Sequence, residues 1–240
     1  MVKQNFPTWD TVLVPQGAEY QAVKKGLQKA HSALQVLPIP VGFQAVTHTL
    51  YQGSLAEQFQ QRSPQGIIIL GLAGSLSPQL TKGQVVLYRA IQSLSGPQTR
   101  LGAWNLETVT DFLSRLNQPI TLVNALNSDR VITQAQEKFH LGETYQAQVV
   151  DMEGAALSQY GQKNQIPMVM LRVISDDVDQ SLPDLSQVYN TQGDLQPWLL
   201  AKALFQQPLA GLNLITGSLF ALNKLEQLAT QLATAIGKAV

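Results

Sequence analysis

The sequence predicts an α/β fold: a single three-layer α/β/α domain with a central twisted sheet of mixed direction. Short apolar runs typical of buried strands alternate along the chain with segments of helical periodicity. The 240 residues are 45% hydrophobic and 13% charged, which is enough apolar material to enclose one large core. We find no linker, internal repeat or second domain, so residues 1–240 are expected to form one domain.

The first part of the chain alternates between strand and helix patterns. Its predicted elements are a buried strand at 11–14, a helix at 19–31, an edge strand at 36–40, a helix at 54–61 and strands at 66–70 and 84–91. The small residues at 71–77 predict a turn between the last two strands. Glycine in such a turn lets the backbone approach a ligand closely.

The second part of the chain ends in helical patterns. Its predicted elements are an exposed, turn-rich segment at 93–102, a helix at 104–116, a strand at 120–124, a helix at 133–141 and terminal helices at 195–205 and 209–236. The last helix carries leucines at helical spacing and few charges. We expect residues 194–240 to pack on the domain or on a partner subunit.

Two apolar runs that each end in a carboxylate organise the middle of the sequence. The run 147–150 leads through Asp151 and Met152 to Glu153, and the run 168–171 leads to Asp176. A helical pattern separates them, so they predict a β-α-β unit with parallel, neighbouring strands. Ligands bind outside the carboxyl ends of parallel strands, where both carboxylates are expected. Taken singly, either residue also fits an ordinary helix start or cap.

These two segments carry a family resemblance. Asp-Met-Glu-Gly-Ala-Ala at 151–156 and Arg-Val-Ile-Ser-Asp at 172–176 resemble the purine nucleoside phosphorylase and methylthioadenosine/S-adenosylhomocysteine nucleosidase family. The glycine-rich segment 71–80 and the first strand end, 12–19, are similar to the same family in the same order. The run from Asp179 to Pro183, with Gly193, Asp194 and 205–208, resembles one branch, the hopanoid-associated phosphorylases.

The resemblance implies a role for each carboxylate in releasing a purine from a ribosyl compound. Asp176 would protonate N7 of the leaving base, and Glu153 would hold the ribose hydroxyls beside Met152. Glu19 would polarise a water molecule, with Gln21 as the rival for that position. Further pocket residues implied are Leu72, Ala73, Gly74, Val131, Ile132, Val150 and Ser175. The family often places an aromatic residue near Val131 and Ile132, a part that Trp104 could take here.

The choice between water and phosphate as nucleophile turns on arginine, which suits phosphate because of its fixed fork of donors. The phosphorylases of the family carry an arginine just before the serine of the glycine-rich segment, and 70–74 contains none. Arg130 is the only nearby candidate that the sequence offers. The missing arginine therefore favours water as the nucleophile, and with the family resemblance this implies a purine nucleosidase that acts on a 5′-substituted ribonucleoside and releases adenine. A phosphorylase and a catalytically weak nucleoside-binding protein are the alternatives.

Composition narrows the choice of partners. The formal net charge is zero, which provides no electrostatic footprint for nucleic acid. The chain has no cysteine, and its three histidines (His31, His48 and His140) have no metal-binding spacing, so neither metal nor cofactor is expected. No stretch of about 20 apolar residues could span a membrane. We expect a cytoplasmic homo-oligomer, a dimer or larger, that binds a small purine ribosyl substrate.

Overall fold

The computed structural model describes residues 8–94, 98–100, 113, 116, 118–185, 188, 190 and 192–237. Most of the helix expected at 104–116, including Trp104, lies outside the described residues, as does much of the segment 93–102. The described part of that segment includes a short strand at 98–100. None of the described helices is long and apolar enough to cross a membrane.

The fold is α/β with a central mixed sheet, as predicted. The eight described strands are β1 (Thr11–Pro15), β2 (Gln35–Ile39), β3 (Ile67–Ser75), β4 (Val85–Ser93), β5 (Gln98–Arg100), β6 (Ile120–Asn127), β7 (Val149–Asp151) and β8 (Met168–Asp176). Five of them close into a ring, because β3 pairs with β7, β7 with β6, β6 with β4, β4 with β8 and β8 with β3. Strands β1 and β2 extend the sheet from β3, and β5 extends it from β4.

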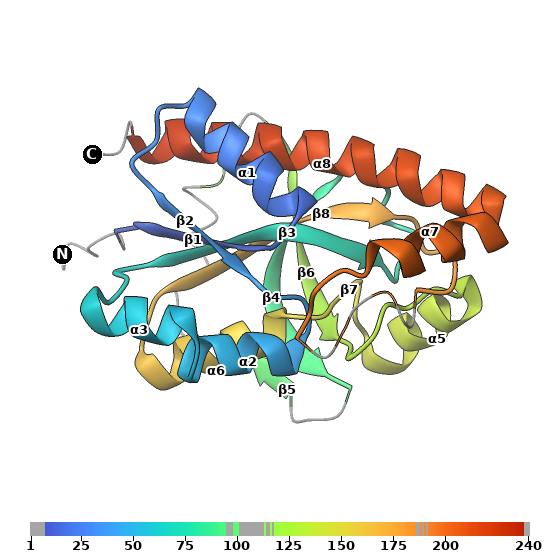
Figure 1. Cartoon of the computed structure of the whole chain (residues 1–240), viewed down its shortest axis with the longest axis horizontal. Coiled ribbons are helices and arrows are strands. Elements are labelled where there is room, and N and C mark those ends of the chain that lie inside the picture. The colour runs from blue at the N-terminus through green and yellow to red at the C-terminus, as the bar shows by residue number, and fades with distance from the viewer. Residues whose placement is uncertain are drawn as a thin grey trace.

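Helices cover both sides of the sheet (Figure 1). They are α1 (Ala18–Lys29), α2 (Phe43–Tyr51), α3 (Ser54–Gln61), α5 (Ala135–Tyr145), α6 (Gly154–Asn164), α7 (Pro197–Gln206) and α8 (Pro208–Gly237). Helices α1 and α8 lie on one side of the sheet, and α2, α3 and α6 lie on the other. The three-layer prediction is thereby confirmed.

The side chains of β3 show why a continuous apolar run forms this central strand. Ile67 and Ile69 belong to the core shared with α2, α3 and α6, while Ile68 and Leu70 belong to the core shared with α1 and α8. Successive strand residues point to opposite faces, so a strand buried on both faces needs apolar residues throughout.

Two predictions about these elements were wrong, and one helix was missed. Residues 71–75 continue β3 instead of turning, because β8 and β7 supply hydrogen-bonding partners along that stretch. Helix α2 was not predicted. Strands β7 and β8 are neither neighbours nor parallel: β3 pairs with both, antiparallel to β7 and parallel to β8. Apolar runs identify buried strands but contain no information about strand direction.

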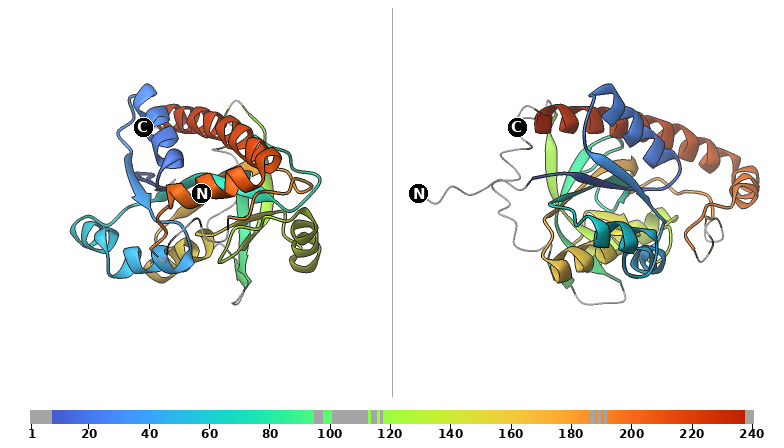
Figure 2. Two further views of the ribbon diagram at one scale, coloured as in Figure 1. Left: turned by 45° about the vertical axis from the view of Figure 1, so that its right-hand side comes forward. Right: turned by 60° about the vertical axis from the view of Figure 1, so that its left-hand side comes forward.

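The terminal helix α8 packs along α1, and the two views of Figure 2 show them side by side. Val23 and Leu27 of α1 share a core cluster with Leu225 and Leu228 of α8. Glu226 forms ion pairs with Lys25 at 3.0 Å and Lys29 at 2.5 Å. The helices approach so closely at Gly26 that a β-carbon there would lie 2.4 Å from the Glu226 carbonyl oxygen.

We therefore predict that Gly26→Ala destabilises the protein, by about 1–3 kcal/mol, because the two helices must separate to admit a methyl group. The measurement is the free energy of unfolding in urea. Gly237→Ala is the matched control, since a β-carbon at that helical glycine meets nothing within 4 Å. Equal stability of the two variants would contradict the close packing described here.

Candidate active site

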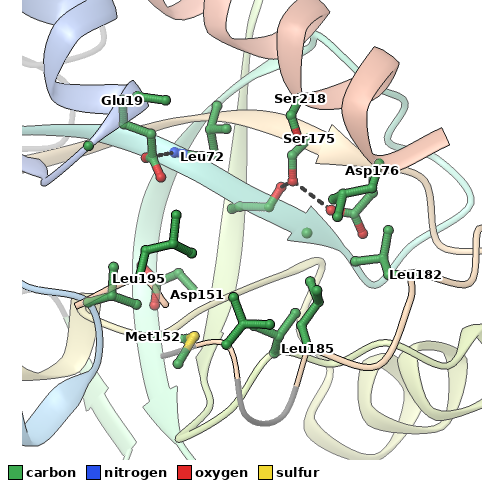
Figure 3. A pocket seen from close by; sticks show the side chains of 18 of the residues that line it. Glu19, Leu72, Asp151, Met152, Ser175, Asp176, Leu182, Leu185, Leu195 and Ser218 are labelled. Atoms are coloured by element: carbon green, nitrogen blue, oxygen red, sulfur yellow. Dashed lines mark hydrogen bonds between the residues drawn. The ribbon is translucent and has the colours of Figure 1, made fainter. Parts of the chain in front are cut away.

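A cavity of about 520 Å³ lies between the sheet and the C-terminal helices. This volume is within the range of about 300–1,000 Å³ that is usual for small-molecule sites. Figure 3 shows Glu19, Asp151 and Asp176 in the cavity together with the leucines Leu182, Leu185 and Leu195. The cavity therefore has a polar part, formed at strand ends, and an apolar part.

The structure brings all eleven site residues expected from the sequence into the lining of this cavity. They are Glu19, Leu72, Ala73, Gly74, Val131, Ile132, Val150, Met152, Glu153, Ser175 and Asp176. Gln21, the rival of Glu19, is exposed on α1 and does not belong to the described lining. The carboxylate of Glu19 instead accepts a hydrogen bond from the backbone N–H of Leu72, at 2.7 Å.

Glu153 and Asp176 both line this cavity, but the strands that precede them are not the neighbouring parallel pair that was predicted. Gly74 of β3 pairs with Val150 on one side and with Asp176 on the other. Strand β7 runs antiparallel to β3, so the residues that follow β7, Met152 and Glu153, lie beside the part of β3 that precedes Gly74. The two carboxylates thus lie on either side of β3, which contributes Leu72, Ala73 and Gly74 to the lining between them.

Arg172 lies behind the polar part of the cavity with its side chain fully buried. Its guanidinium donates a hydrogen bond to Asp151 at 2.9 Å and lies 3.7 Å from Glu153. Burial lowers the pKa of Arg172, but the charges of Asp151, Tyr88, Glu153 and Glu19 outweigh it, so the net shift is upward. Arg172 is therefore the fixed positive charge of a buried acidic cluster.

Gly71 makes this cluster possible. A β-carbon at that position would lie 2.1 Å from an Arg172 Nη1 atom and 2.7 Å from a carboxylate oxygen of Glu19. Only a residue without a side chain lets both groups lie against β3. The small residues in this stretch therefore serve the close approach of charged side chains, not a turn.

Burial raises the pKa of the Glu19 carboxyl group to about 7, against the opposing effects of Arg172 and the Leu72 N–H. The pKa of Glu153 is also raised, first by burial and then by Asp151 and Glu19, although Arg172 and the Gly42 N–H act against the shift. A carboxylate whose pKa lies near neutrality is a stronger base than an exposed one. Glu19 is thus suited to accept a proton from water.

Asp176 has two polar partners at the other end of the polar part. One carboxylate oxygen accepts a hydrogen bond from the Ser175 hydroxyl at 2.6 Å, and the other contacts the Lys138 ammonium at 2.5 Å. Lys138 comes from α5 and is completely buried. Asp176 is therefore held as one member of a buried ion pair.

Sequence reasoning did not identify Lys138, Asp151 or the central place of Arg172. It named Arg130 as the only nearby arginine, yet Arg172 lies closer to the acidic cluster. Arg130 is the only lysine or arginine in the described lining, and it pairs with Glu137 of α5. The signal for Arg172 and Asp151 was present, since both belong to the two motifs that revealed the carboxylates.

The C-terminal helices provide much of the apolar part of the cavity. The large aliphatic residues of this part are Leu182, Leu185, Val188, Leu195, Leu200, Leu204, Leu214, Ile215, Leu219 and Leu222. The leucines of the predicted stripe on the last helix fall into two groups, one in the core and one in the cavity wall. Leu225, Leu228 and Leu232 are buried in the core, whereas Leu214, Leu219 and Leu222 line the cavity.

A cavity lined by buried carboxyl groups, two of which (Glu19 and Glu153) have a raised pKa, is the kind of site that an acid–base enzyme uses. The chain belongs to the phosphorylase superfamily, whose family model matches residues 40–194. This membership and the site together make the protein an enzyme of N-glycosyl bond cleavage. No group of metal-binding side chains occurs in the part of the chain that the structure describes.

Solved structures share this fold over nearly their whole length. The 5′-methylthioadenosine/S-adenosylhomocysteine nucleosidase of Helicobacter pylori is 14% identical, with a TM-score of 0.66 and coverage of 98% of this chain and 100% of that one. Futalosine hydrolase of Helicobacter pylori is 13% identical, with a TM-score of 0.65 and coverage of 96% and 97%. The 5′-methylthioadenosine/S-adenosylhomocysteine nucleosidase of Campylobacter jejuni is 14% identical, with a TM-score of 0.58 and coverage of 91% of this chain and 99% of that one. No curated protein sequence matches the chain.

The raised pKa of Glu19 predicts a pH-dependent stability. The carboxyl group stays protonated up to about pH 7 in the folded protein but only to about 4.5 in the unfolded chain. Relative to Glu19→Gln, the wild type should therefore lose about 3 kcal/mol of unfolding free energy as the pH rises from about 4.5 through 7. Above that pH the difference should stay constant.

Urea unfolding of both proteins between pH 5 and 8 measures this difference. Glu57→Gln, at an exposed glutamate of α3, is the control and should differ from wild type by the same amount at every pH. A Glu19→Gln variant with a pH-independent difference would show that Glu19 does not titrate as its burial requires.

Proposed function

We propose that this protein is an N-ribosyl hydrolase that releases a purine, adenine, from a 5′-substituted ribonucleoside. The observation that carries the proposal is the charge of the cavity. Its lining contains four acidic residues, Glu19, Asp151, Glu153 and Asp176, but only one arginine, which is already paired. A phosphate dianion would be repelled by such a site, whereas water is not.

Each carboxylate has one task in this reaction. Cleavage passes through an oxocarbenium-like state, which water attacks at C1′ while the C1′–N9 electron pair moves onto the base. Glu19 accepts a proton from the attacking water. Asp176 takes up a proton from solvent and delivers it to N7, which leaves the carboxylate in its ion pair with Lys138. Glu153, beside Met152, accepts hydrogen bonds from the ribose hydroxyls.

The structural neighbours agree with this reaction. Their names describe them as nucleosidases of 5′-methylthioadenosine and S-adenosylhomocysteine and as a futalosine hydrolase. At 13–14% identity they share the fold, and the substrate assignment for this chain rests on its own side chains.

The apolar part of the cavity is the space left for a substituent on the ribose 5′ carbon. Ten aliphatic side chains surround it, and Leu219 and Ile215 are also partly open to solvent, at 63% and 44% exposure. A long apolar substituent could therefore extend from the ribose toward the surface beside α8. This agrees with the resemblance of the tail to the hopanoid-associated branch.

We also propose that the protein forms a homo-oligomer through α7 and α8. Trp198, Phe205 and Leu209 are exposed there by 65%, 89% and 80% and do not line the cavity. Apolar surface of this extent is usual at subunit contacts.

The nucleophile can be tested directly by incubating the protein with adenosine and 5′-alkylthioadenosines, with and without phosphate, and separating the products by chromatography. We expect free adenine under both conditions, together with ribose from adenosine and the 5-alkylthioribose from each 5′-alkylthioadenosine. Asp176→Asn should lower kcat by about 10²–10⁴-fold, because general-acid catalysis is lost. Ribose 1-phosphate among the products would establish a phosphorylase instead, and binding without any product would establish a nucleoside-binding protein.

The apolar wall makes a second prediction about selectivity. Leu219→Asn places an amide in the part of the cavity assigned to the substituent, so kcat/KM for 5′-hexylthioadenosine should fall about tenfold or more relative to adenosine. Leu209→Asn, on the same helix but outside the cavity, is the matched control and should leave the ratio of the two substrates unchanged. A ratio that Leu219→Asn does not alter would exclude this placement of the substituent.

A further inference from the structure

Exposed apolar side chains are concentrated on the C-terminal helices. Eight of the eleven large apolar residues that are exposed in the described part of the chain lie between residues 195 and 220. The subunit contact proposed above accounts for three of them. A further four belong to α8 and are called here the α8 apolar face, which consists of Leu212, Ile215, Leu219 and Phe220.

The α8 apolar face is continuous with the wall of the cavity. Ile215 and Leu219 line the cavity and are also open to solvent, so the cavity reaches the surface beside them. Leu212 lies three residues before Ile215, on the same side of the helix, and Phe220 follows Leu219. This half of α8 lies at the outer edge of the molecule and extends beyond the end of α1 (Figures 1 and 2). The face therefore forms an outer rim of the cavity opening.

The charged residues of this part of the chain are lysines. No aspartate or glutamate occurs from residue 195 to residue 225, whereas Lys202 and Lys224 do. The Lys224 ammonium group lies 5.8 Å from the centre of the Phe220 ring. The next acid along α8, Glu226, is already paired with two lysines of α1. Lysines beside an exposed apolar surface are typical of helices that lie on anionic membranes.

We propose that the α8 apolar face docks on an anionic phospholipid bilayer and holds the cavity opening against the lipid. No described helix can cross a membrane, so α8 would lie in the plane of the interface with its apolar side chains among the lipid chains. Lys202 and Lys224 would then lie near the phosphate groups, because a long lysine stem lets its ammonium reach the polar layer.

The inference rests on the proposed function in one respect. A nucleoside with a long apolar substituent is concentrated in the bilayer, since each CH₂ group that leaves water favours the lipid. From there the substituent can enter the cavity past Ile215 and Leu219 without crossing water, while the adenosyl group moves toward the carboxylates. The docking surface and the apolar part of the cavity thus serve the same substrate.

A bilayer fits the α8 apolar face better than a second subunit does. A subunit that covered Ile215 and Leu219 would close the cavity where the substituent enters, whereas mobile lipid chains leave the opening free. A two-fold contact centred on this face would also place the Lys224 residues of both copies close together, with no acid of the face to pair with them. Anionic head groups supply the missing negative charge.

Sedimentation with lipid vesicles tests the docking without any substrate. The wild type should sediment with vesicles of equimolar phosphatidylcholine and phosphatidylglycerol. Leu212→Asn combined with Phe220→Asn should lower the affinity for these vesicles by about tenfold or more, because apolar surface is lost without a change of charge. Neither residue belongs to the cavity lining. The matched control is Leu122→Asn combined with Phe139→Asn, at exposed residues outside the C-terminal helices, which should bind as the wild type does.

The charge of the lipid is tested separately. Lys224→Gln should lower the affinity for the mixed vesicles by about fivefold and leave the affinity for pure phosphatidylcholine unchanged. Lys163→Gln, at an exposed lysine of α6, is the control and should change neither affinity. Equal binding of Lys224→Gln and the wild type to the mixed vesicles would contradict the assigned orientation.

Three results would overturn the proposal. The first is a wild type that stays in solution with the mixed vesicles. The second is a Leu212→Asn/Phe220→Asn variant that binds them as strongly as the wild type does. The third is a variant whose vesicle affinity is unchanged but whose molar mass by light scattering falls, which would make the face a subunit contact. If the double variant does not fold, Leu212→Asn alone replaces it, because Leu212 is 58% exposed.

Activity measurements separate this proposal from the proposed function. The wild type should cleave 5′-hexadecylthioadenosine embedded in the mixed vesicles. The Leu212→Asn/Phe220→Asn variant should lose about tenfold or more of that rate, yet cleave soluble adenosine as the wild type does. Equal rates of both proteins on the embedded substrate would refute delivery from the bilayer. If neither substrate is cleaved, the proposed hydrolase function fails, while sedimentation still decides whether α8 docks on lipid.

Discussion

The buried guanidinium of Arg172 is the constraint on which the rest of the site depends. It lies on β8, carries a positive charge with none of its side chain exposed, and needs negative partners from other elements. Asp151 and Glu153 provide them from the end of β7. Burying such a charge is tolerable only with close partners, so the ion pairs hold β7 and β8 in a fixed relation.

The same requirement explains the form of β3 between those strands. Gly71 leaves room for the guanidinium and for Glu19, and the stretch beyond it pairs with β8 on one side and β7 on the other. A strand of small residues can carry polar groups close to both of its edges. The closed ring of strands thus concentrates four carboxyl groups at one place, while α7 and α8 cover that place with aliphatic side chains.

The sequence predicted which residues form the site, but it did not predict the direction and pairing of the strands that carry them. Motifs at strand ends indicated which side chains meet, and those side chains do line one cavity. The direction of β7 could not be inferred, because an apolar run is the same in a parallel and an antiparallel strand. Lys138 was not found either, since a lysine within a helical pattern normally faces solvent. Its burial depends on the chain after β8, which provides two carbonyl oxygens.

Two buried cations, Arg172 and Lys138, neutralise the carboxyl groups of the polar part of the cavity, and they differ in how many carboxyl groups each one contacts. Arg172 faces several acids, and burial raises the pKa values of Glu19 and Glu153 although the charge of Arg172 opposes the shift. Lys138 forms an ion pair with a single carboxyl group, that of Asp176. Carboxyl groups of one chemical type thereby have different cationic partners around one cavity. The strand carrying Gly74 lies between them, so the geometry of the sheet places Glu153 on the side of β7 and Asp176 on the side of β8.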